Sequence, residues 1–166
     1  MGILSNKYNR QDSDDINGRA LAAQAFALQS ALDVCQANIM MADENMVINY
    51  VNHSLKAMLK RNEIELQRHI TGFSADTLIG TNVDSFHKNP AHQRRLISSL
   101  TDVFKTQLKI GPLTFALIAT PVFDHNRVRL GTVVEWQDLT EELAKLASPV
   151  KAEEDAAKRK AEGGNN

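Results

Sequence analysis

The sequence is poor in the features that build thiolate clusters, disulfides and membrane anchors. It has a single cysteine, Cys35, among 166 residues, so no disulfide forms within one chain and a metal site of several thiolates is excluded. No apolar run reaches the roughly 18 residues of a membrane-spanning helix, and residues 1–7 lack the apolar stretch of a signal peptide. We therefore expect a cytoplasmic chain without membrane insertion, in which any metal is held by histidine, carboxylate or a cofactor.

An excess of charge of one sign is also absent. The formal net charge is -1 and no long face is rich in lysine and arginine, so the chain lacks the electrostatic footprint of a nucleic-acid-binding protein. The glycine-rich phosphate loop, the paired catalytic carboxylates and the cysteine motif of flavin photosensors are missing as well. Because no set of nucleophile and base can be identified, we do not interpret the chain as an enzyme.

Length and hydrophobic content predict one domain with extensions. A chain of 166 residues with 43% hydrophobic content can bury one sizeable core. Residues 1–18 are polar, and we expect them to be disordered. The domain is expected at 37–139, and residues 140–166 are expected to form an exit or linker helix and a tail.

Residues 19–36 are expected to form an amphipathic helix before the domain. Their apolar residues follow the four-three-four spacing of a coiled-coil seam: Leu21, Ala25, Leu28 and Leu32. The same spacing returns in the C-terminal segment, at Leu139, Leu143, Leu146 and Val150. These stripes are shorter than the three or four heptads that define a coiled coil. Each stripe therefore either pairs two chains into a homodimer or packs on its own domain.

Apolar runs and turn residues alternate along the rest of the chain and predict an α+β domain. Residues 38–52 contain two short apolar runs split by a polar turn, which is the pattern of a β-hairpin. Short helices are expected next, the first opening at Asn52 and the second capped by Asn62. Three antiparallel strands then follow, at 103–110, 113–123 and 128–137.

The alternation of side chains along the last two strands predicts which residues face the interior. Leu117 of the middle strand and Trp136 of the last strand are expected to look into the same interior. Leu130 has the same parity as Trp136, so we expect it on the inner side and Arg129 on the outer side.

The segment 84–95 carries the densest functional signal. Asn89 and Pro90 are typical of a helix start, because Asn is a favoured N-cap and Pro fits the first helical position. The apolar spacing that follows predicts a helix from Pro90 to near Thr101. His87 lies just outside this helix on a tight turn, which aims its side chain as a metal ligand requires. The ordinary alternative is a surface or hydrogen-bonded histidine.

The order of these elements and three short motifs resemble the PAS sensor fold. That α+β fold is a five-stranded antiparallel sheet with short helices on one face, here flanked by N- and C-terminal helices. The motifs are NIMMAD at 38–43, FHKNPAHQR at 86–94 and EWQDLT at 135–140. Together they resemble the PAS domains of bacterial methyl-accepting chemotaxis receptors, in particular the haem-binding, aerotaxis-type group.

This resemblance implies a sensor of a diatomic gas, O2 above all, with haem b as its cofactor. In that group the histidine before the long helix holds the haem iron, which implies that His87 is the metal ligand. A tryptophan on the last strand faces the gas and an apolar residue on the middle strand guards the distal side; these positions fall on Trp136 and Leu117. Asp138 with Thr140 matches the junction that passes the signal to the following helix and a downstream receptor signalling region.

Some assignments keep an alternative interpretation. His92 shares a helical stripe with Leu96 and Leu100, where it reaches a haem propionate or acts as an alternate ligand, or is simply a satisfied, partly buried histidine. Trp136 has an ordinary interpretation as a core aromatic. The competing function for the whole chain is a cofactor-free PAS module for dimerisation or interaction, or a sensor of another small ligand.

Overall fold

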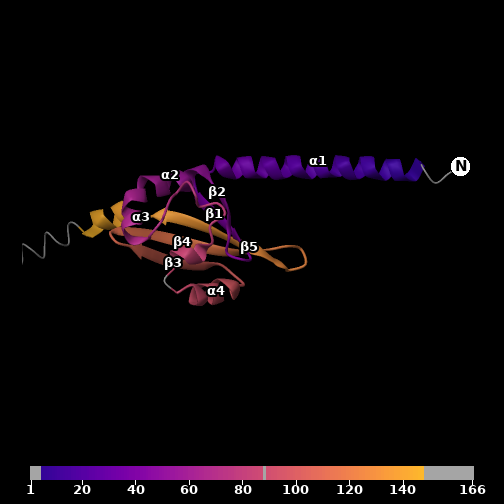
Figure 1. Cartoon of the computed structure of the whole chain (residues 1–166). Coiled ribbons are helices and arrows are strands. Elements are labelled where there is room, and N and C mark those ends of the chain that lie inside the picture. Colours follow the sequence, from indigo (N-terminus) through magenta and orange to yellow (C-terminus); the bar gives the residue numbers. More distant parts are fainter. Residues whose placement is uncertain (1–4, 88, 148–166) are drawn as a thin grey trace, which may run out of the picture.

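A five-stranded antiparallel sheet forms the centre of the protein (Figure 1). The computed structural model describes residues 5–87 and 89–147. Across the sheet the strands follow the order β2-β1-β5-β4-β3, and each neighbouring pair is antiparallel. They are β1 (Asn38–Asp43), β2 (Ile48–Val51), β3 (Phe104–Ile110), β4 (Leu113–Phe123) and β5 (Arg129–Asp138). The predicted hairpin and the three later strands are confirmed.

Helices occupy the connection from β2 to β3 and both ends of the sheet domain. The connection contains α2 (His53–Arg61), α3 (Glu63–His69), the 3-10 turn η1 (Val83–Phe86) and α4 (Pro90–Ser98). Buried residues of α2, α3 and η1 join those of the sheet in one core cluster. A long helix, α1 (Ser5–Asp33), precedes the sheet and extends away from it (Figure 1), and residues 140–147 are helical after it. The expected α+β fold is confirmed.

The expectation that residues 1–18 are disordered is wrong for 5–18, which belong to α1. Their polar composition excludes them from a buried core, and that was the basis of the expectation. A helix satisfies its backbone hydrogen bonds locally, however, so a helix formed over the alanine-rich part of α1 extends through the polar residues before it. Residues 1–4 and the expected tail at 148–166 lie outside the described residues.

The expected side-chain alternation in β5 fails near its start. Leu130 is 52% exposed, and Arg129 instead donates hydrogen bonds to the Leu100 carbonyl (2.9 Å) and to Thr132 Oγ1 (2.8 Å). Two features cause this. The pairing of β5 with β4 shifts its register, and the backbone of Gly131 has a φ of 152°. A Cβ atom at Gly131 would lie 2.2 Å from the Ala42 carbonyl oxygen, so this close approach requires glycine.

Asparagine side chains begin two of the helices, as predicted. The Asn52 side chain accepts a hydrogen bond from the Leu55 backbone at the start of α2, and Asn89 caps α4 with Pro90 in its first turn. Asn62 precedes α3, but its side chain makes no capping bond. Its amide instead donates to the Met58 carbonyl and to Asp138 Oδ2, so the prediction of a capping side chain there is wrong.

The Asn52 side chain is completely buried and joins the end of α1 to β1 and α2. Its Oδ1 atom accepts hydrogen bonds from the backbone amides of Ile39 (2.9 Å) and Leu55 (3.0 Å). Its Nδ2 group donates to the backbone carbonyls of Ala37 (2.8 Å) and Leu32 (3.1 Å). Because the Asn52 side chain is removed from solvent, these four hydrogen bonds replace the bonds it would make to water.

Replacing Asn52 by alanine is expected to lower the free energy of unfolding by about 3 kcal/mol, because it leaves several backbone groups without a partner. Urea unfolding followed by circular dichroism measures the change. The matched control is Asn126→Ala in the exposed β4–β5 turn, expected to stay within about 0.5 kcal/mol of the wild type. A loss at Asn52 as small as that of the control would contradict the role of this side chain.

Candidate cofactor pocket

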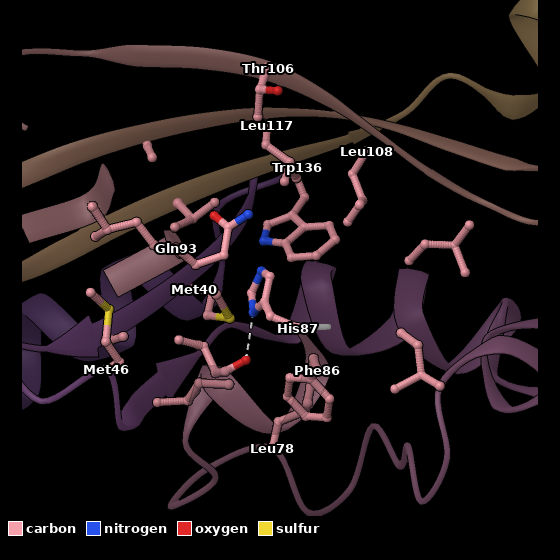
Figure 2. Close-up of a pocket in the computed structure, with 18 of the residues that line it drawn as sticks. Met40, Met46, Leu78, Phe86, His87, Gln93, Thr106, Leu108, Leu117 and Trp136 are labelled. Atoms are coloured by element: carbon pink, nitrogen blue, oxygen red, sulfur yellow. Dashed lines mark hydrogen bonds between the residues drawn. The ribbon is translucent and has the colours of Figure 1, made fainter. Parts of the chain in front are cut away.

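A cavity of about 500 Å³ lies between the inner face of the sheet and the segment from α3 to α4 (Figure 2). This volume falls within the range of roughly 300 to 1,000 Å³ that is usual for small-molecule sites. Its walls are mainly apolar side chains, among them Met40, Leu78, Phe86, Leu108 and Leu117. The cavity therefore suits a large apolar ligand held by a few polar groups.

His87 follows η1 and turns its imidazole into this cavity (Figure 2). Its backbone amide donates to the Asp84 carbonyl (3.1 Å), which closes the turn. Its Nδ1 atom lies 2.7 Å from the Val83 carbonyl oxygen. Because a carbonyl oxygen only accepts hydrogen bonds, Nδ1 carries the proton, and in the neutral ring Nε2 keeps a lone pair. This arrangement, with a carbonyl fixing the tautomer, is the usual one for a histidine that binds a metal.

Trp136 brings a hydrogen-bond donor to the same cavity from β5. Its Nε1 atom is buried and has no hydrogen-bond partner among the described residues. Figure 2 shows the indole nitrogen and the imidazole of His87 turned toward one another. The indole is held in place by Phe115, whose ring packs against it edge-on with the centroids 5.7 Å apart. A buried N–H without a partner is unfavourable, so an acceptor atom in the cavity would stabilise it.

Three of the four residues expected at the site line this one cavity: His87, Leu117 and Trp136. Leu117 lies directly opposite Trp136 in the pairing of β4 and β5, which confirms that both look into the same interior. His92 is exposed and is not part of the cavity wall, so the expectation of a partly buried histidine is wrong, and its role toward a haem stays a prediction.

His92 was misplaced because the face of α4 that lines the cavity is rotated about the helix axis relative to the predicted stripe. The cavity face of α4 is made by Gln93, Leu96 and Ile97, at i, i+3 and i+4, rather than by the stripe of His92, Leu96 and Leu100. No residue of α4 is fully buried, and the helix ends at Ser98 instead of near Thr101. Its orientation therefore depends on contacts that helical periodicity does not specify.

Sequence reasoning missed the other polar residues of the cavity wall, which include Gln93, Thr106 and Thr132. The Gln93 side chain lies close to His87 and Trp136 in Figure 2, whereas the exposed Thr106 lies on the edge strand β3, farther from these two rings. Gln93 shares a helical face with Leu96 and Ile97, and that spacing was the available signal. Thr132 accepts a hydrogen bond from Arg129, and no sequence pattern points to that contact.

Hydrogen bonds join the end of β5 to the following helix at Asp138 and Thr140. Asp138 Oδ1 accepts from the Thr140 backbone (3.0 Å), and Oδ2 accepts from the Asn62 side chain (2.9 Å). Thr140 Oγ1 in turn accepts from the backbone amide of Thr114 on β4 (3.0 Å). Burial by itself raises the pKa of Asp138, but the hydrogen bonds from Thr140 and Asn62 outweigh it and lower this pKa overall. The charged carboxylate is the form that makes this junction.

The strand order, the helical connection and the inner cavity define a PAS domain. A structure of the PAS domain from Bordetella pertussis BvgS shares this fold, with a TM-score of 0.54 at 12% identity over 80% of this chain and 98% of that one. A structure of the Aer2 receptor from Vibrio cholerae, described as a dual PAS-haem oxygen sensor, has a TM-score of 0.57 at 37% identity. That match covers 63% of this chain and 95% of the other.

The chain belongs to the PAS domains of methyl-accepting chemotaxis receptors. The methyl-accepting chemotaxis protein McpB of Pseudomonas aeruginosa is 45% identical over 123 residues, which make up 74% of this chain. The matched part spans only 18% of the length of that relative. No family model matches the sequence. Within the described residues, no helix has both the length and the apolar character needed to cross a membrane.

Proposed function

We propose that this chain is a haem-binding PAS sensor that detects a diatomic gas, O2 above all, and acts in chemotaxis-type signal transduction. The observation that carries the proposal is the pair formed by His87 and Trp136. An imidazole with a free Nε2 lone pair and an indole N–H without a partner among the described residues turn toward one another in an apolar cavity. The similarity to the Vibrio cholerae receptor described as a dual PAS-haem oxygen sensor supports the same assignment.

In this proposal, different residues of the cavity bind the cofactor and the gas. When bound, haem b would supply an iron that takes up the gas. His87 would hold the iron through Nε2 while the Val83 carbonyl keeps its ring in place. Trp136 would donate its Nε1–H to a gas held in the cavity, and Leu117 would limit the space open to water.

The proposed signal leaves through the end of β5. A ligand shifts a conformational equilibrium only if it binds one state better than the other. The hydrogen bond from Trp136 to the gas supplies this difference, because it favours one position of β5. Asp138 and Thr140 link that strand to helix 140–147, so a movement of β5 reaches the chain that follows and, in the parent receptor, a signalling region. This function needs no catalysis, and we place it in the cytoplasm.

We further propose that the protein is a homodimer through its flanking helices. The free helix α1 exposes several large apolar side chains: Ile16, Leu21, Phe26 and Leu28. Leu21 and Leu28 belong to the four-three-four stripe, so a second copy of α1 would cover them. The alternative function is a PAS module that dimerises in this way with no cofactor in its cavity.

The first test is the absorption spectrum of the protein purified with haem supplied. The wild type is expected to show a Soret band that shifts on reduction, and His87→Ala is expected to lose this band because the iron has no ligand from the protein. His92→Ala, an exposed histidine on α4, is the matched control and should keep the band. A colourless wild type, or an unchanged spectrum in His87→Ala, would reject haem binding through His87.

The second test concerns the indole. Trp136→Phe is expected to retain haem but to release O2 faster by about tenfold or more, because a hydrogen bond to a charged acceptor contributes roughly 1.5–3 kcal/mol. Stopped-flow measurement gives the dissociation rate. Carbon monoxide, which develops less negative charge, serves as the control ligand, and its release should change much less. Equal rates of O2 release in both proteins would refute the distal role of Trp136.

The third test separates the dimer from the monomer. Sedimentation is expected to give a dimer for the wild type and a monomer for the double variant Leu21→Asp with Leu28→Asp, because two charges then lie in the proposed seam. The control is Val128→Asp, where an equally exposed side chain lies far along the chain in the β4–β5 turn (58% exposed). A monomeric wild type, or a dimer that survives the double change, would contradict dimerisation through α1.

A further inference from the structure

The backbone of Trp136 is tied to the start of β1 by a side chain. Asn38 is the partner of Trp136 in the pairing of β1 with β5, and its Nδ2 group donates to the Trp136 carbonyl (2.9 Å). Because a carbonyl oxygen only accepts, the amide nitrogen of Asn38 must face Trp136. The Oδ1 atom of Asn38 is thereby directed at Ser54 on α2, whose hydroxyl lies 2.8 Å away.

The Ser54 hydroxyl has two acceptors within hydrogen-bond distance and one proton to donate. Its Oγ atom lies 2.8 Å from Asn38 Oδ1 and 2.9 Å from the backbone carbonyl of Gln36. A hydroxyl donates a single hydrogen bond, so it serves either Asn38 or Gln36 at one time. Gln36 is exposed, and its carbonyl accepts from water when Ser54 turns away. The two arrangements therefore differ in which acceptor, the Gln36 carbonyl or Asn38 Oδ1, lacks the hydrogen bond from Ser54.

These two arrangements have different effects on the molecule. When the Ser54 hydroxyl donates its hydrogen bond to Asn38, it holds the amide that fixes the Trp136 peptide. When it donates to Gln36, it holds the linker between α1 and β1 instead. The rest of this linker is anchored independently, by Asn52 and by the hydrogen bond from Tyr50 to Asp33 (2.7 Å).

We propose that Asn38 and Ser54 are positioning residues for Trp136, and that the Ser54 hydroxyl transmits a displacement of Trp136 to the linker ahead of β1. A signal then reaches α1 as well as helix 140–147. This proposal rests on the proposed gas-sensing function, because gas binding supplies the displacement. Coupling between sites requires an element with two discrete arrangements that both sites bias, and the single proton of Ser54 shared between two acceptors is such an element.

The test is hydrogen exchange of the amides at 34–38 in the reduced, haem-loaded protein, with and without carbon monoxide or O2. O2 is expected to change exchange at this linker by about two- to tenfold, the equivalent of one hydrogen bond. Ser54→Ala is expected to keep the Soret band and lose this change, and Ser54→Thr, which restores the hydroxyl, is expected to recover it. Ser98→Ala on the exposed face of α4 is the control and should behave as the wild type.

A second variant tests the link to Trp136 itself. Asn38→Asp keeps an oxygen near Ser54 but removes the donor to the Trp136 carbonyl. It is expected to release O2 faster than the wild type and to lose the exchange response at 34–38. An exchange response that survives in Ser54→Ala, or a haem protein that binds O2 without any response at 34–38, would overturn this inference alone. A wild type with no Soret band would overturn the gas-sensing function and this inference with it.

Discussion

The buried amide of Asn52 is the interaction on which the architecture depends. Its hydrogen bonds hold the end of α1, the first residues of β1 and the start of α2 at one point. Since β1 pairs with β5, this point also sets the position of the strand that carries Trp136. An apolar residue could fill the same space, but it would leave these backbone groups without partners. The frame of the cavity thus depends on one side chain outside it.

The unfilled cavity lowers the stability of the domain. A domain of this size gains most of its stability from close packing, yet its inner face keeps about 500 Å³ unfilled by protein atoms. An indole N–H without a partner adds to this cost. Buried residues of the core cluster, among them Leu55, Met58 and Phe115, offset these losses. Unfavourable features confined to one place are characteristic of a binding site.

Local sequence patterns were reliable where hydrogen bonding or side-chain alternation is local. The hairpin, the Asn52 and Asn89 caps and the strand parity around Leu117 all follow from such patterns. His92 was misplaced because the rotation of α4 about its axis depends on packing across the cavity. Arg129 and Leu130 were misplaced because the close approach of β1 and β5 at Gly131 distorts the strand.

By itself the sequence determined most of the elements and their order, since these depend on neighbours a few residues apart. It also singled out His87 and Trp136, through the resemblance of the motifs around them to those of haem-binding PAS domains. Only the tertiary structure decided that the two rings meet, that Gln93 joins them and that His92 does not. Those facts depend on the distance between α4 and β5, which are far apart in the chain and are brought together only by the folded core.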